Sequence, residues 1–360
     1  MGGIIQSPAR APKTGAPDGT AGRGEDDHPM RRFRMRNDLE RAVIDGFALP
    51  LGLEPGRIGA PKQGYILAYT PGEEEPDTYA FHVVVSHERL APLVRSAFGL
   101  LPAEIYAIVE ISSRDAYRTT DVFLGEELIR LEDFRQGWER FEPFLLEDGT
   151  VAAGANSDDP FVEIFLDQWK GLSIHVPPSM REEVEAVLAG FELEEVAQTW
   201  DPSDGGEGTV EPMQTRPVLD VDDASDIDEL LLELRRAWRL ELNIDPETNV
   251  DESGRRLGLT LWHAVVVVAD AAGAADRGGY ASIWATAGSL QQMERLIEGA
   301  LEDYPEWKFQ EIYAIDRVAY DERPEALVEL PPRSTEAAVH QVYIDTWESP
   351  PEPAPEPPDG

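Results

Sequence analysis

The sequence predicts an α+β protein made of repeated ferredoxin-like units. In such a unit, the order strand, helix, strand, strand, helix, strand gives an antiparallel sheet with both helices on one face. The first observation is a repeat: Glu-Ile-Tyr-Ala-Ile occurs at 104–108 and again at 311–315. A Tyr-Ala pair precedes each copy, at 79–80 and at 280–281, with an apolar run and a helical pattern in between. Internal repeats of this kind determine the architecture.

Composition divides the rest of the chain. Residues 1–29 are rich in Pro, Gly and charge, and 348–360 alternate Pro with Glu, so we expect disordered tails at both ends. Residues 198–216 are polar and Gly-rich and are predicted to be a linker. The three remaining segments share the ferredoxin-like pattern, and they are the units 30–120, 121–197 and 217–347.

The first unit shows the pattern in full. Its helix over 87–99 has Leu90, Leu93 and Val94 on one apolar face, Ser86 as a candidate cap and Gly99 as a candidate stop. Pro71-Gly72 marks a turn between two β-rich runs. The elements expected in this unit are strands at 31–36, 64–70, 78–86 and 104–111 and helices at 37–47 and 87–99.

The second unit matches in pattern only. Ser179 and Glu182 are spaced as a capping box, and Gly190 follows the last apolar residue of the helix. Trp169-Lys170-Gly171 is a tight turn between two strands. The elements expected here are strands at 122–129, 161–168, 172–176 and 191–196 and helices at 131–146 and 180–190.

The third unit repeats the first. Ser289 and Gln292 form a capping box before a helix whose buried face includes Met293 and Leu296. An added hairpin at 326–330 and 340–347 is expected to cover one edge of the sheet. The other elements expected are strands at 217–221, 263–269, 279–286 and 311–319 and helices at 226–240 and 290–301.

Charge excludes two classes of partner. The chain has 70 acidic and 31 basic side chains and a formal net charge of −39. Seven basic and four acidic residues fall within 1–36, which leaves −42 for the remainder. Nucleic acids and anionic membranes are bound through basic patches, so neither is expected as a partner. The acidity is interpreted first as a general feature that keeps the chain soluble, and the alternative is that it attracts a basic protein partner.

The residue types present and the lengths of the apolar runs exclude further kinds of chemistry and location. The chain contains no cysteine, which excludes disulfides and thiolate chemistry. It contains no apolar run of about 18 residues, so no membrane span is expected and a cytoplasmic location is predicted.

No motif predicts a catalytic, cofactor or metal residue. His82 and His87 lie beside Glu88, but their spacing is not that of a zinc helix. The loop that begins at Asn249 has calcium-loop oxygens but Thr260 where a bidentate Glu is needed. Two further groups are interpreted as ordinary polar residues, namely His28, His175, His263 and His340, and a helix-start cluster of Asp220, Asp222, Asp223, Asp226 and Asp228.

The predicted function is therefore non-catalytic binding. Abundant acid without a site motif favours a protein-interaction, regulatory or immunity-type module that binds a basic protein. Two alternatives from other classes remain open. One is a small-ligand sensor with a pocket between plait sheets, and the other is an enzyme that uses carboxylates alone.

Overall fold

Two large antiparallel sheets and two two-stranded ones are found in the described part of the chain. The computed structural model describes residues 33–56, 61–72, 77–199, 213–220, 226–274, 277–331 and 335–348. The predicted N-terminal tail, most of the predicted linker and all but one residue of the C-terminal tail lie outside these ranges. The α+β class and the antiparallel sheets expected from the sequence are confirmed.

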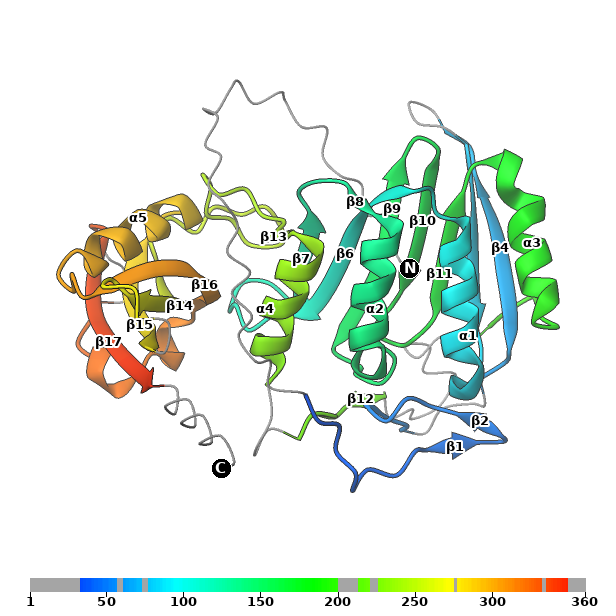
Figure 1. Cartoon of the computed structure of the whole chain (residues 1–360), viewed down its shortest axis with the longest axis horizontal. Helices are drawn as coiled ribbons and strands as arrows, with labels where there is room; N and C mark the ends of the chain where they lie inside the picture. Colours follow the sequence, from blue (N-terminus) through cyan, green and yellow to red (C-terminus); the bar gives the residue numbers. More distant parts are fainter. Residues whose placement is uncertain are drawn as a thin grey trace, which may run out of the picture. The chain divides into compact units, whose positions relative to one another are not determined.

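The larger sheet has nine strands (Figure 1). Its central strands carry continuous apolar residues on one face because successive side chains point to opposite sides. In spatial order its strands are β13 (Leu240–Leu242), β7 (Thr120–Gly125), β6 (Glu104–Ser112), β9 (Val151–Asp158), β10 (Phe161–Leu166), β11 (Leu172–Val176), β5 (Thr78–Val84) and β4 (Gly64–Thr70), and β8 (Ile129–Arg130) also pairs with β6.

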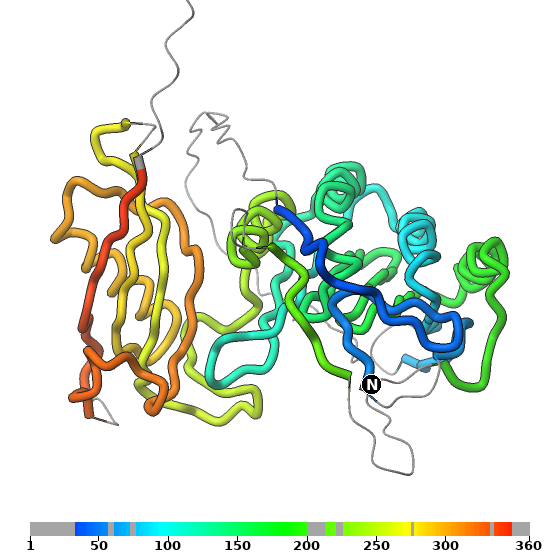
Figure 2. Tube along the Cα trace, turned by 90° about the horizontal axis from the view of Figure 1, so that it is seen from below, coloured from blue at the N-terminus to red at the C-terminus, as the bar shows by residue number. Residues whose placement is uncertain are grey.

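Four helices lie on one face of this sheet, as Figures 1 and 2 show. They are α1 (His87–Ala97), α2 (Leu131–Leu145), α3 (Arg181–Gly190) and α4 (Ile227–Trp238). Their apolar faces and the sheet share one core, in which Leu93 is fully buried. Helices α2 and α4 meet through Trp138 and Trp238, whose ring centroids are 6.4 Å apart. Gly137 permits this approach, because a Cβ there would lie 2.4 Å from the indole nitrogen of Trp238.

The smaller sheet has its own core. Its strands, in spatial order, are β16 (Trp307–Val318), β14 (Thr260–Asp270), β15 (Arg277–Ala287) and β17 (Ala338–Glu348). Helix α5 (Leu290–Leu301) contributes Met293 and Ile297 to that core, whereas Leu296 is only partly buried. The predicted cap is confirmed, since Ser289 Oγ accepts from the Gln292 N–H. The full capping box is not formed, because Gln292 Oε1 accepts from the Gly288 N–H and not from that of Ser289.

Several predicted elements near the N-terminus are wrong. Residues 37–47 form no helix. Strands β1 (Val43–Ile44) and β2 (Phe47–Ala48) make a hairpin there, since Asp45 and Gly46 take the positive φ angles that an Asp-Gly turn favours. The described part of 31–36 makes only an isolated bridge from Met35 to Leu219, in place of two predicted strands. The short strands β3 (Leu53–Glu54) and β12 (Gln214–Thr215) pair nearby.

Two predicted helix caps are also wrong. Met180 is the residue before α3, because 178–180 form a turn of 3₁₀ helix, and no side-chain bond caps that helix. Ser86 does not cap α1, because its hydroxyl bonds to the Glu88 carboxylate and accepts from the Ala48 N–H.

Predicted strands differ at two further places. Residues 191–196 make only an isolated bridge, between Glu195 and Tyr65. Of the predicted C-terminal hairpin, 340–347 belong to β17, which does cover an edge of the small sheet, but Glu325–Leu327 form a 3₁₀ turn.

The ferredoxin-like repeat is not confirmed. Both copies of the pentapeptide lie in strands that follow a helix. However, β6 lies inside its sheet between β7 and β9, whereas β16 is an edge strand next to β14. Helix α4, which the repeat assigns to the third unit, packs on the large sheet. A five-residue alternation of apolar and polar side chains specifies a strand and its faces, but not its neighbours.

Candidate functional site

Polar side chains follow one another across the face of the large sheet opposite the helices. Residues directly opposed in neighbouring strands share a face. Asn156 in β9 opposes both Tyr106 in β6 and Glu163 in β10, and Glu163 opposes His175 in β11. The residues that alternate with these four belong to the helix-side core. The sheet therefore aligns four polar side chains on rigid strands.

Two further carboxylates lie on the same side. Glu110 follows Tyr106 by four residues in β6, and its charge interacts with that of Asp167, just after β10. Asp167 in turn lies near His82, because a Cβ on Gly171 would be within 2.9 Å of atoms from both side chains. We call Glu110, Asn156, Glu163, Asp167 and His175 the carboxylate cluster.

The centre of the carboxylate cluster is buried and incompletely hydrogen-bonded. Glu163 and Asn156 are each 5% exposed. Glu163 Oε2, Asn156 Oδ1 and His175 Nδ1 have no hydrogen-bond partner among the described residues. Buried polar atoms are almost always partnered, and leaving one without a partner costs about 1–3 kcal/mol. Asn156 Oδ1 can only accept a hydrogen bond, and so can Glu163 Oε2 when its carboxyl group is ionised.

Burial shifts the pKa values of the carboxylate cluster toward the neutral forms. It raises the pKa of Glu163 to about 7, the Glu110 charge adds to this rise, and a hydrogen bond from Asn156 opposes it. Burial also raises the pKa of Glu110 and, to a smaller extent, so does Asp167. It lowers the pKa of His175.

Lys170, a cation near the carboxylate cluster, lies in the turn after β10. Asp167 Oδ1 accepts from the Trp169 and Gly171 N–H groups, each at 2.8 Å. Burial raises the Asp167 pKa, while these bonds and the charges of His82 and Lys170 oppose the rise. Lys170 Nζ donates to the Val151 carbonyl at 2.6 Å, and burial lowers its pKa to about 8. Lys170 is thus bonded to β9, and among the described residues it supplies no bond to Glu163.

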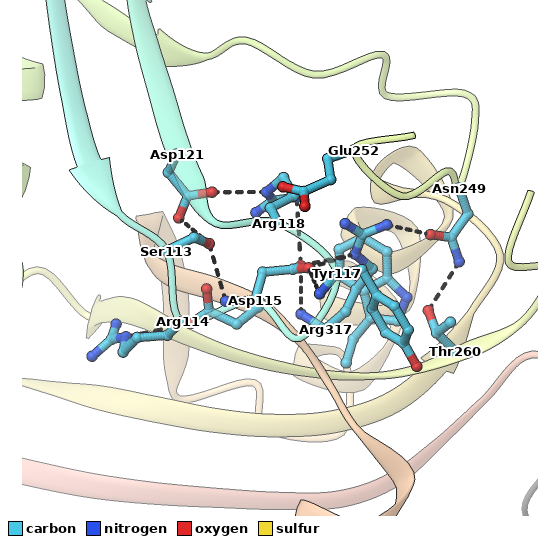
Figure 3. Close-up of polar contacts among 12 residues, drawn as sticks. Ser113, Arg114, Asp115, Tyr117, Arg118, Asp121, Asn249, Glu252, Thr260 and Arg317 are labelled. Atoms are coloured by element: carbon cyan, nitrogen blue, oxygen red, sulfur yellow. Dashed lines mark hydrogen bonds and ion pairs between the residues drawn. The ribbon is translucent and has the colours of Figure 1, made fainter. Parts of the chain in front are cut away.

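A second buried charge cluster lies elsewhere (Figure 3). Arg317 of β16 and Asp115 of the loop between β6 and β7 form an ion pair at 2.8 Å, with side chains 3% and 0% exposed. Both Asp115 oxygens accept hydrogen bonds, from Arg317 and from the Tyr117 N–H. Arg317 Nη1 also donates to Asn249 Oδ1 and the Val250 carbonyl. These bonds fasten β16 to that loop, which is a structural role.

The residues singled out in the sequence do not gather into one site. His87 Nε2 lies 3.0 Å from Glu147, while His82 lies near the carboxylate cluster. Asn249 cannot act as a calcium ligand, since its amide bonds to Arg317, Gly258 and Thr260.

The acidic helix start has structural contacts. Asp226 caps α4 by accepting from the Glu229 N–H, and Asp228 pairs with Arg114 at 2.8 Å. Asp222 and Asp223 lie outside the described residues. Within the described ranges, no three His, Asp or Glu side chains are arranged to hold a metal ion.

Sequence reasoning missed Glu110, Asn156 and Glu163. The one available signal was Glu163, which stands inside the apolar run Phe-Val-Glu-Ile-Phe-Leu of 161–166. A charged residue at such a place must face outward or find a partner. Which of the two applies depends on β9 and β11 beside it.

Searches against family models, curated proteins and solved structures found no match for the chain. None of the helices in the described ranges has the length and apolar character needed to cross a membrane.

Proposed function

We propose that this chain binds a basic protein, and that a cationic side chain of that partner occupies the carboxylate cluster. The observation that carries the proposal is Glu163 Oε2, a carboxylate oxygen on a 5% exposed residue without a hydrogen-bond donor in the described structure. A group in that state destabilises the fold unless a ligand supplies the missing donor.

The chemistry of the unpartnered atoms favours a guanidinium group. Glu163 Oε2 and Asn156 Oδ1 both need donors, and the two residues are opposed in neighbouring strands. A guanidinium offers five N–H donors in one plane and no acceptor, so one group can serve both oxygens. Binding of a cation would also favour the ionised form of Glu163 and reverse the rise in its pKa.

The charge of the whole chain supports the same proposal. A net charge of −39 attracts a basic protein over a distance and speeds encounter, while suppressing binding of acidic proteins. Contact at the carboxylate cluster would then supply specificity, because a buried charge pair discriminates more strongly than exposed charges.

A titration with a deca-arginine peptide tests the proposal. We expect Glu163→Gln to weaken binding at least tenfold at pH 8, where Glu163 is ionised, and to remove the gain in affinity between pH 5 and pH 8. The control Glu302→Gln removes an exposed charge beyond α5 and should have little effect. Equal losses in the two variants would show that only the overall charge acts. A lysate pull-down with the native chain and Glu163→Gln then identifies the partner.

A small-ligand sensor is the second candidate, and one cavity favours it. The cavity encloses about 820 Å³, within the range of ligand sites. It is lined by Arg36, Asp148, Arg216 and Ile227 among others, and it does not lie between two plait sheets. Arg36 and Arg216 are already paired with Asp38 and Glu54. A small molecule retained in native mass spectrometry would favour this function over binding of a protein.

A carboxylate-dependent enzyme is the third candidate. A carboxyl with a pKa of about 7, as in Glu163, is suited to exchange protons near neutral pH. Turnover of a substrate that requires Glu163 and follows its ionisation would favour catalysis over binding.

A further inference from the structure

The two edges of the small sheet differ in their protection. An exposed strand edge offers unpaired N–H and C=O groups to any other strand, and proteins usually block such edges. At the β16 edge, the Ile312 carbonyl accepts from Arg235 Nη1 and the Arg317 carbonyl accepts from the Ala116 N–H, each at 2.9 Å. Two register shifts against β14 further distort β16.

The β17 edge is less protected within the described residues. It has one register shift against β15, between Trp284 and Ala285. Strand β17 runs for 11 residues and pairs only with β15 among the described strands. Residues 338–347 contain no Pro, Lys or Arg, and Asp345 is the one acidic side chain among them. Tyr343, near the middle of the strand, is 62% exposed. A long edge of this kind is suited to pair with another strand.

We infer that a second copy of this chain occupies the β17 edge, through antiparallel pairing about a two-fold axis at Tyr343. The strand is complementary to itself in this register. Gln341 would lie opposite the partner's Asp345, and Tyr343 opposite the partner's Tyr343, which gives polar and aromatic cross-strand pairs.

The acidity of the chain does not prevent this pairing. In the proposed register the two copies of Asp345 are offset by four residues along the strand, or about 14 Å at a rise of ~3.4 Å per residue. That separation exceeds the screening length of about 8 Å at physiological ionic strength. We therefore expect the dimer to strengthen with added salt, in contrast to binding of a basic protein.

Single-cysteine variants of the full chain test the register, because the native chain has no cysteine. Opposed residues in antiparallel strands have Cα atoms about 4.5–5.5 Å apart, within reach of a disulfide. Under mild oxidation we expect Tyr343→Cys to form a covalent dimer much faster than Val328→Cys, a control residue that is 56% exposed and lies outside the strands. Equal rates for the two variants would overturn the proposal.

Sedimentation velocity supplies an independent readout. The native chain should be dimeric at micromolar concentration in 0.15 M salt. Tyr343→Lys should be monomeric but folded, because two like charges would then oppose each other across the two-fold axis. A monomeric native chain, or a Tyr343→Lys variant that stays dimeric, would contradict the proposal. Glu163→Gln should leave the dimer unchanged, so this inference and the proposed function can fail separately.

Discussion

The Asp115–Arg317 pair and the carboxylate cluster both bury acidic groups, yet only the first has a cation bonded to its central acid. Asp115 and Arg317 stand 202 residues apart in the chain, and the fold brings them within 2.8 Å. Glu163 instead opposes Asn156 and His175, and its pKa rises to about 7. A buried carboxyl is kept ionised by a partner or becomes neutral. The two regions thus differ in whether a cation is bonded to the buried acid, and that difference is why we propose Glu163 as a binding residue.

The largest expected effect tests the structural role of Asp115. Asp115→Ala should destabilise the chain by about 3–5 kcal/mol, because it leaves the buried Arg317 charge without its partner. Urea denaturation followed by circular dichroism measures this loss.

A double variant sharpens this test. In Asp115→Leu combined with Arg317→Met, both charges are replaced by apolar groups, and stability should recover in part. Recovery should be incomplete because the Tyr117 and Arg317 N–H groups lose their acceptor. A loss below about 0.5 kcal/mol for Asp115→Ala alone would show that the pair contributes nothing to the fold.

In the carboxylate cluster, we expect removal of a charge to stabilise the chain instead of destabilising it. Glu163→Gln should stabilise the chain by about 1–3 kcal/mol at pH 8 and by close to nothing at pH 4. The folded-state pKa of about 7 exceeds the ordinary value of 4.5, so the folded chain holds more protons than the unfolded chain between these values. Stability conferred by the protonated form is present below pH 4.5 and is lost as the pH rises through 7.

Urea denaturation of the native chain and of Glu163→Gln at pH 4, 6 and 8 measures this dependence of stability on pH. If Glu163→Gln were destabilising at pH 8, the carboxylate would already have a partner, and the cluster would resemble the Asp115 site.

The smallest expected changes in stability concern two serines, one in each region. Ser113 Oγ donates to Asp121 and accepts from the Asp115 N–H, so Ser113→Ala should cost about 1 kcal/mol. Ser173 lies in β11 on the face of the carboxylate cluster and has no side-chain hydrogen bond among the described residues. Ser173→Ala should therefore change stability by less than about 0.5 kcal/mol. Thermal melts of both variants measure the difference, and equal losses would contradict the contrast between the two regions.

Local patterns in the sequence predicted single elements well. The apolar stripe around Leu93 and the Ser289 cap locate α1 and α5, because each depends on residues within one or two turns. Strand β9 was missed. Its Val-Ala-Ala-Gly-Ala stretch has little β propensity, and its place between β6 and β10 supports it instead.

Features that depend on pairing between distant parts of the chain could not be predicted from the sequence. The repeat of Glu-Ile-Tyr-Ala-Ile suggested equivalent strands, but strand order depends on partners distant in the chain. The carboxylate cluster was missed for the same reason. Glu163 becomes a site residue only when β9 and β11 place Asn156 and His175 beside it.

The packing of α4 on the large sheet has a consequence for synthesis. Trp238 and Leu240 belong to the same core as Phe134, so that core lacks part of its covering until residue 242 has been made. On a ribosome that adds about 5–20 residues per second, the exposed faces of α2 and β7 would wait for several seconds before α4 and β13 arrive. A nascent chain stalled at residue 197 should therefore be open to proteases and chaperones, whereas one whose residue 242 has left the exit tunnel should resist them.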